Sequence, residues 1–126
     1  MQLSVVTPEG SFYDGEIDSL VAPGWDGSLG VLKGHAALVT ELGAGLLVAK
    51  TAGEETKIVL AGGYLQVLKD KITVLATYAV NRSAIDKEQA RKDLEEAQSM
   101  KAHTQDDMKS RLAAIERAKA LIDHAE

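Results

Sequence analysis

The sequence predicts a β+α fold, in which an N-terminal antiparallel β-sandwich is followed by a C-terminal antiparallel two-helix hairpin. All 11 glycines and both prolines lie in the first 80 residues. The last 46 residues, by contrast, hold 19 of the 33 charged side chains. Because helix-breaking residues and dense mixed charge occupy different parts of the chain, we expect a sandwich domain at residues 1–81 and a helical hairpin domain at residues 82–126.

Strand-like segments recur about every eight to twelve residues in the first part, a spacing that is typical of sandwiches and barrels. Turn signals at residues 8–10 and 23–24 end the first strands. Two hairpins are expected further along, with strands at 45–50 and 56–61 and at 63–68 and 72–77. No helical pattern separates these segments, so a parallel sheet with crossover helices is not expected.

The second part predicts two helices with narrow apolar stripes. The first begins near Ser83 or Asp86, since each fits a capping box, and the second begins at Thr104 or Asp106. Their stripes are Ala90, Leu94, Ala97 and Met100, and Met108, Leu112, Ile115, Ala118 and Ile122. Small residues allow close antiparallel packing, but such short helices have little stability of their own. We therefore expect a mobile appendage that can dock in more than one way.

Several classes of function are excluded by what the sequence lacks. The formal net charge of -5 argues against nucleic-acid binding, which needs a clustered positive face. There is no cysteine, and the three histidines lack metal-site spacing, so no metal is expected. Neither a G-x-S-x-G elbow nor a phosphate-binding loop occurs, and the glycines at 24, 27 and 30 are expected to bend a strand pair. We therefore expect no catalytic residue.

The N-terminus does not resemble a secretory signal and no apolar run is long enough to span a bilayer, so the chain is expected to be soluble.

Four segments in the same order give the chain its resemblance to the epsilon subunit of the F-type ATP synthase. The first, at 27–32, matches the family's G-x-L-G-[IV]-L pattern, and the second, GHAALVTEL, is similar to its G-H-A-P-L-[LV]-T-x-L. AGGYLQVLKDKITVLA is similar to the family's G-G-[FY]-x-E-V strand and hairpin, and AIDKEQARKDLEEA to its I-D-x-x-R-A helix start. Ala37 and Lys33 stand where the family prefers proline, which fixes φ, so this loop is expected to be less rigid here.

The resemblance implies a non-catalytic central-stalk (rotor) subunit that couples the catalytic head to the c-ring. It implies that the sandwich contacts the gamma subunit and the c-ring, and that the helices either fold against the sandwich or extend toward the alpha and beta subunits and restrain ATP hydrolysis. It also implies a peripheral position at the cytoplasmic face of the plasma membrane, or at the stromal face of the thylakoid in a plastid, held only through the complex. The alternative is a free-standing β-sandwich adaptor whose helix hairpin binds an unrelated protein.

The resemblance also implies two sets of contact residues. The loops that face the c-ring in this family match Ser28, Leu29, Gly30, His35, Ala36 and Leu38, with His35 as a polar contact and not a chemical group. In the extended state, basic groups of the second helix would meet the beta subunit, and the candidates are Arg111, Arg117 and Lys119. The alternative for these three basic side chains is a solvated helix face, where each exposed ion pair contributes only about 0–1 kcal/mol.

The chain also carries an incomplete form of the family's ATP-binding motif, here called the degraded ATP motif. In family members that bind ATP on the helix pair, the I-D-x-x-R-A arginine belongs to the site. Here Asp86 and Ala90 match, but Gln89 replaces that arginine; Arg117 matches a further arginine, and uncharged Leu121 falls near another. A triphosphate needs several cationic or N–H donors to replace its hydration. We therefore expect no cofactor, and ATP binding by the isolated chain that is weak or absent.

Overall fold

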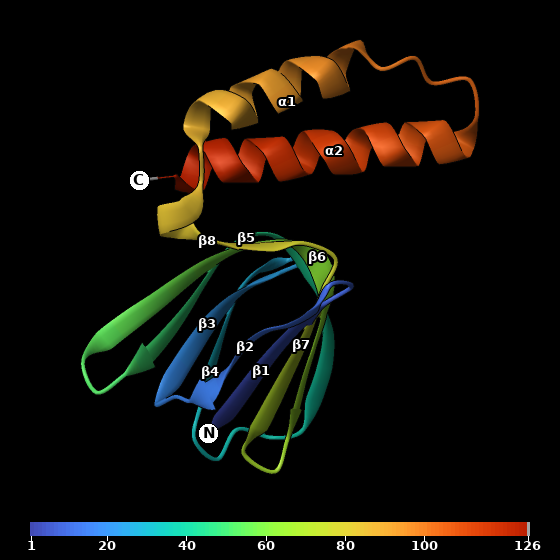
Figure 1. Cartoon of the computed structure of the whole chain (residues 1–126). Coiled ribbons are helices and arrows are strands. Elements are labelled where there is room, and N and C mark those ends of the chain that lie inside the picture. Colours follow the sequence, from blue (N-terminus) through green and yellow to red (C-terminus); the bar gives the residue numbers. More distant parts are fainter. Residues whose placement is uncertain (126) are drawn as a thin grey trace.

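The computed structural model describes residues 1–125, as a β-sandwich with two helices packed across one end (Figure 1). The strands are β1 (Gln2–Thr7), β2 (Gly10–Glu16), β3 (Ser19–Gly24), β4 (Gly27–Leu32), β5 (Leu38–Thr51), β6 (Glu54–Leu68), β7 (Lys71–Ala76) and β8 (Ala79–Asn81). A short 3-10 helix η1 (Arg82–Ala84) leads into α1 (Lys87–Ser99) and α2 (Gln105–His124). The predicted order of a sandwich and then a helical pair is confirmed. The division into two domains at residues 81 and 82 stays a prediction, and β8 ends at Asn81.

The strands pair in the order β2-β1-β7-β6-β5-β3-β4, and β8 pairs with β6. Among the described strands, β1 and β7 pair in parallel and the other neighbours pair antiparallel. The first part of β6 pairs with β8, and its last part pairs with β7. The long strands β5 and β6 therefore belong to both layers of the sandwich.

The long strands correct one expectation from the sequence. Residues 56–61 and 63–68 were expected to be separate strands, but both lie in continuous β6. The β5–β6 register skips one residue on each strand between the pairs Leu42–Gly63 and Ala44–Ala61. Gly62 and Gly63 have positive φ angles of +82° and +129° and allow the strand to bend there without ending. A glycine pair that looks like a turn in the sequence is thus a bend within one strand.

The core is aliphatic, as the low aromatic content of 4% requires. Its largest fully buried members come from most of the strands, and they include Leu3, Leu20, Leu47, Ile58, Leu60, Leu65 and Ile72. The two predicted tight hairpins are confirmed: Ala52-Gly53 joins β5 to β6, and Lys69-Asp70 joins β6 to β7. Lys69 and Asp70 both have positive φ, as a two-residue type I′ turn requires.

Both helices begin at capping residues that the sequence predicts. Asp86 accepts a hydrogen bond from the Gln89 backbone N–H and starts α1, and Thr104 accepts one from the Asp107 N–H and starts α2. The alternative start at Ser83 is not used for α1, because that residue lies in η1. The two helices pack against each other as an antiparallel pair (Figure 1).

The predicted apolar stripes are only partly buried. Ala90, Ala97 and Ala118 are buried as expected, but Met100, Met108 and Leu112 are exposed at the end of the hairpin away from the sandwich. Two residues outside the predicted stripe, Ala120 and Leu121, are buried instead. The reason is that the last turns of α2 contact the sandwich as well as α1, which widens the buried face there.

Candidate functional site

The helical hairpin docks on the sandwich through its own small apolar cluster. Its buried members are Val59, Ala90, Ala120 and Leu121. Partly buried side chains surround them: Leu46, Tyr78, Val80, Ile85 and Ile122. The sandwich core forms a second cluster that includes none of the four buried docking residues. Docking therefore adds an interface to a sandwich that already has its own core.

Two polar contacts strengthen the docked arrangement. The Arg82 Nε donates a hydrogen bond of 2.9 Å to the His124 carbonyl oxygen near the end of α2, where the helix dipole favours a cation. The Arg117 guanidinium carbon lies 4.7 Å from the centroid of the Tyr78 ring. A cation–π contact of this kind contributes about 0.5–1 kcal/mol at an exposed site. Both contacts would be lost if the hairpin left the sandwich.

The basic residues proposed to meet the beta subunit have different surroundings in the docked state. Arg111 Nη2 donates to the Gln98 carbonyl oxygen at 3.0 Å and so links α2 to α1. Arg117 lies over Tyr78, as described above. Lys119 is exposed and lines a hollow between α2 and the β3–β4 turn, beside Trp25. In the docked structure, two of the three basic side chains, Arg111 and Arg117, therefore already have contacts within the chain.

The residues of the degraded ATP motif are not gathered into a phosphate site. The Asp86 carboxylate caps α1, Ala90 is buried in the docking cluster, and the Gln89 Nε2 donates to the Asp93 carboxylate at 3.0 Å. The groove between the helices is lined partly by Asp93, Glu96 and Arg117. Leu121, at the position of a family arginine, is 8% exposed and belongs to the docking cluster. Two carboxylates beside one guanidinium would repel a triphosphate.

We therefore predict that the isolated chain binds ATP weakly or not at all near neutral pH. The physical reason is that Gln89 and Leu121 supply no positive charge, and that Arg117 has an internal partner in Tyr78. Isothermal titration calorimetry of the full chain with Mg-ATP measures this directly. A dissociation constant in the low micromolar range would contradict the prediction, and Gln89→Arg is the variant expected to increase the affinity.

The predicted c-ring residues lie along the edge strand β4 and the loop that follows it. Ser28, Leu29 and Gly30 lie in β4, His35 and Ala36 in the loop, and Leu38 at the start of β5. Leu29 and Leu38 are half-buried and pack against the sandwich core, whereas the other four are exposed. Ser28 pairs with Pro23 near the β3–β4 turn, so the six residues do not form one loop cluster.

The loop around His35 lies at the end of the sandwich opposite the helices (Figure 1). The Gly34 N–H donates to the Asp70 carboxylate at 3.2 Å, which ties the loop to the β6–β7 turn. The His35 N–H donates to the Leu32 carbonyl at 3.0 Å, and its ring Nδ1 lies 2.7 Å from the Ala36 carbonyl oxygen. These contacts hold the exposed imidazole by backbone groups at the tip of the sandwich.

An exposed apolar face on the sandwich was not predicted from the sequence. The cross-strand pairs Val6–Leu75 and Leu75–Tyr64 place three apolar side chains in one row. Tyr64 is 57% exposed, Leu75 53%, and Val39 on the neighbouring strand 70%. The sequence feature that could have predicted it is the strand alternation in residues 63–68. Leu65 and Val67 are buried, so Tyr64 and Leu68 lie on the opposite, exposed face. We call Val6, Val39, Tyr64 and Leu75 the apolar face; such patches mark contact surfaces.

Within residues 1–125, no helix is both long and apolar enough to cross a membrane. The same described residues contain no group of three or more His, Cys, Asp or Glu side chains arranged to hold a metal ion.

Comparison with known proteins agrees with the resemblance seen in the sequence. Residues 1–82 match the family described as "ATP synthase, Delta/Epsilon chain, beta-sandwich domain". The chain is 37% identical over 107 residues to the ATP synthase epsilon chain of Alkalihalophilus pseudofirmus, covering 85% of this chain and 80% of that one. It is 36% identical over 96 residues to the chloroplastic epsilon chain of Guillardia theta, covering 76% and 73% of the two chains.

A solved structure shares the whole fold. It is a chain of the Tetrahymena thermophila mitochondrial ATP synthase central stalk and c-ring, with a TM-score of 0.70 and 15% identity. The match covers 100% of this chain and 96% of that one, including the helices. The match over the sandwich and the identity to epsilon chains decide the family. The chain therefore belongs to the ATP synthase epsilon chains, which are non-catalytic components of that complex.

Proposed function

We propose that this chain is a central-stalk (rotor) subunit that couples the catalytic head of an ATP synthase to its c-ring, and that its helices restrain ATP hydrolysis. The observation that carries the proposal is the docking of the hairpin through a cluster separate from the sandwich core. A sandwich with its own core can stay in the stalk while the hairpin exchanges partners.

The docking interface is small enough for such an exchange. Only two of its four buried side chains, Val59 and Leu121, are larger than alanine. Full burial of a large aliphatic side chain contributes about 1.5–3 kcal/mol. A docked state held by a few such contacts differs from an undocked one by a few kcal/mol, which a partner with differential affinity can supply.

The basic groups of α2 support the identity of that partner. The contact of Arg117 with Tyr78 joins the hairpin to the sandwich and would be released on extension, whereas the Arg111 hydrogen bond joins α2 to α1 and lies within the hairpin. Together with exposed Lys119, the two arginines would then meet acidic segments of the beta subunit, with the alpha subunit beside it. An exchange of internal for external partners makes the net cost of extension small.

The end of the sandwich away from the helices is the proposed c-ring contact. His35 and Ala36 are exposed at this end and Gly30 is exposed along β4, whereas exposed Ser28 lies near the β3–β4 turn, at the end that faces α2. With the c-ring below the sandwich and the head above it, the hairpin lies on the correct side to reach the head. In this arrangement the subunit is peripheral, at the cytoplasmic face of the plasma membrane or the stromal face of the thylakoid, and is held only through the complex.

We assign the gamma contact to the apolar face. Its residues lie on β1, β7, β6 and β5, and none of them belongs to the docking cluster. An exposed group of aliphatic and tyrosine side chains on neighbouring strands suits a permanent protein–protein contact, in which aromatic residues are often the strongest anchors.

Tyr64→Asp is expected to weaken gamma binding by about tenfold or more, because it places a charge at the centre of a buried contact. A pull-down of purified gamma subunit with the variant chain measures the loss. Val21→Asp is the matched control, because Val21, like Tyr64, is an exposed apolar residue of a strand, but it lies outside the apolar face. Equal binding by the two variants would contradict the assignment.

The same pull-down tests the alternative function. A free-standing adaptor whose hairpin binds an unrelated protein would have no affinity for the gamma subunit. Binding of the unmodified chain to gamma therefore supports the stalk function, and its absence with a correctly folded chain supports the adaptor.

A further inference from the structure

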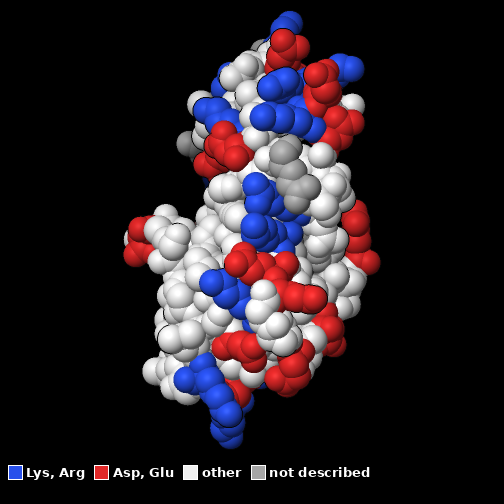
Figure 2. Space-filling view, turned by 90° about the vertical axis from the view of Figure 1, so that its left-hand side faces the viewer, with Lys and Arg blue, Asp and Glu red and all other residues white. Residues whose placement is uncertain are grey.

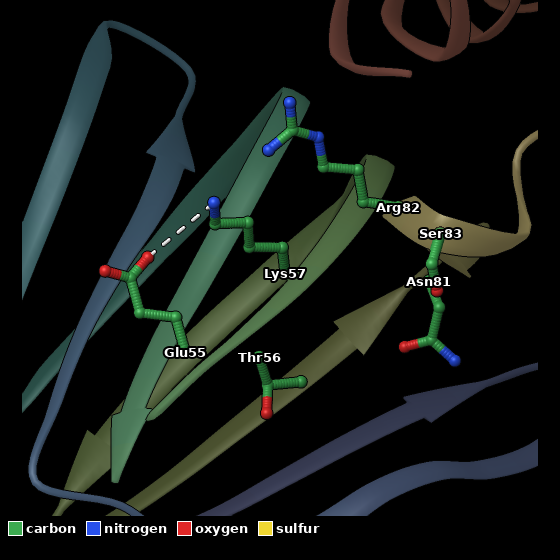
Figure 3. A pocket seen from close by; sticks show the side chains of 6 residues that line it. All are labelled: Glu55, Thr56, Lys57, Asn81, Arg82 and Ser83. Atoms are coloured by element: carbon green, nitrogen blue, oxygen red, sulfur yellow. Dashed lines mark ion pairs between the residues drawn. The ribbon is translucent and has the colours of Figure 1, made fainter. Parts of the chain in front are cut away.

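A polar hollow lies beside the segment that joins the sandwich to the helices. It has a volume of about 460 Å³ and is lined by residues from the start of β6, the end of β8 and η1. Figure 3 shows its six lining side chains: Glu55, Thr56, Lys57, Asn81, Arg82 and Ser83. Among the described residues of the lining, two are cations and one is an acid, which gives these residues a net charge of +1 in a chain whose net charge is -5.

The pairing of β6 with β8 brings the two cations to one hollow. Ile58 pairs with Asn81, the last residue of β8, so Lys57 and Arg82 each lie next to this final pair, Arg82 as the first residue of η1. Ile58 belongs to the sandwich core, while Val59 contacts the helices, so Lys57 shares the outer face with Val59. Like charges that line the same hollow repel each other unless something compensates them.

The internal partners only partly compensate these two charges. The Lys57 Nζ lies 3.9 Å from the Glu55 carboxylate, which is longer than a hydrogen bond. The Arg82 Nε donates to the His124 carbonyl, a neutral group. Figure 3 shows the Lys57 and Arg82 side chains extending to the same side of the ribbon, and Figure 2 shows basic side chains grouped on the side of the molecule where the C-terminus lies in Figure 1.

We propose that this hollow binds a phosphate-class oxyanion, with Lys57 and Arg82 as its two ligands. An ammonium and a guanidinium supply strong charge-assisted donors, which suit the oxygens of a phosphoryl group. The site differs from the degraded ATP motif, none of whose residues lines this hollow. The proposal goes beyond the stalk function and does not depend on it.

The site is linked to the position of the hairpin. The hydrogen bond from Arg82 to His124 orients the guanidinium only while α2 is docked. An oxyanion that binds the oriented guanidinium more tightly therefore stabilises the docked hairpin, and by reciprocity docking increases the anion affinity. Anion binding thus favours the folded-down state.

The test is an NMR titration of the full chain with inorganic phosphate at constant ionic strength, with chloride as the balancing anion. Amide shifts are expected at residues 55–57 and 81–83, with a dissociation constant of about millimolar order. Lys57→Gln and Arg82→Gln should each weaken binding roughly three- to fivefold, and Glu55→Gln should strengthen it, because it removes a carboxylate from the lining. Lys71→Gln removes the same charge from an exposed site elsewhere and should change nothing.

The outcomes separate the sources of the anion. Tighter binding of ADP than of phosphate at the same residues identifies a nucleotide phosphate, and equal binding identifies the free anion. Shifts confined to the groove between α1 and α2, or an unchanged affinity in Lys57→Gln, would overturn the proposal. Lys57→Gln leaves the hairpin contacts intact, so it decides whether the hollow binds the anion even if Arg82→Gln undocks α2.

Hydrogen exchange tests the link between the site and docking. Amide exchange at the end of α2 is expected to be slower in the presence of phosphate, and unchanged exchange would refute the link.

Discussion

Removal of residues 82–126 is expected to raise the ATP hydrolysis rate of the assembled complex while the sandwich stays folded and bound. The sandwich core contains no residue from the helices, and the apolar face and the His35 loop both lie in the retained part. If the extended hairpin adds about 1–2 kcal/mol to the barrier for hydrolysis, its removal corresponds to roughly a five- to thirtyfold faster rate. Steady-state hydrolysis by complexes reconstituted with full-length or truncated chain gives the comparison.

A second variant distinguishes removal of the hairpin from its release. Leu121→Asp in the full chain disrupts the docking cluster but keeps the helices, so it should populate the extended state and lower hydrolysis. Leu112→Asp is the matched control for docking, since this leucine lies on the same helix and is 53% exposed. Hydrogen exchange of α2 in the isolated chain should increase for the first variant alone. Unchanged hydrolysis after truncation, with assembly intact, would count against a restraining hairpin.

Gly63→Ala is expected to lower the free energy of unfolding by more than about 3 kcal/mol, because overpacking and backbone strain act together. A Cβ atom at this position would lie 2.0 Å from the Leu75 carbonyl oxygen and 2.9 Å from the Ala76 Cα. Both neighbours are backbone atoms of β7, which cannot move away without breaking the ladder with β6. The φ angle of +129° adds strain of its own for an L-residue.

Gly10→Ala is the matched control for this effect. Gly10 has a nearly equal φ of +124°, but a Cβ there would meet nothing within 4 Å. Gly10→Ala should therefore lower the free energy of unfolding only by the backbone strain, about 1–3 kcal/mol. Urea unfolding of both variants gives the two free energies, and their difference isolates the collision with β7. Equal destabilisation would show that strain, and not the close approach of β6 to β7, makes glycine necessary at position 63.

Much of the fold could be predicted from local patterns. The helix starts at Asp86 and Thr104, the turn at Lys69 and Asp70, and the order of sandwich and hairpin all depend on residues close together in the chain. Their hydrogen bonds span only a few positions, so composition and spacing are sufficient. The family resemblance likewise depends on short segments in a fixed order, and it agrees with the matched relatives.

The candidate sites could be predicted only in part. The residues matched to the c-ring and beta-subunit contacts are exposed or half-buried, but their grouping was not visible in the sequence. Ser28 and His35 lie toward different ends of one strand and its loop, and Arg117 has an internal partner that only the fold supplies. The apolar face was missed because each of its side chains lies on a different strand from its neighbours.

The sequence by itself determined the two architectures, the capped helix starts, the tight turns and the family. Only the tertiary structure decided that β5 and β6 continue through both layers, that Ala120 and Leu121 are buried against the sandwich, and that Lys57 and Arg82 line one hollow. These features depend on strand register and helix docking between residues far apart in the chain. The burial of apolar surface over the whole molecule determines such contacts, and local propensity does not. The sequence around a glycine or an alanine is the same whether or not another segment packs against it.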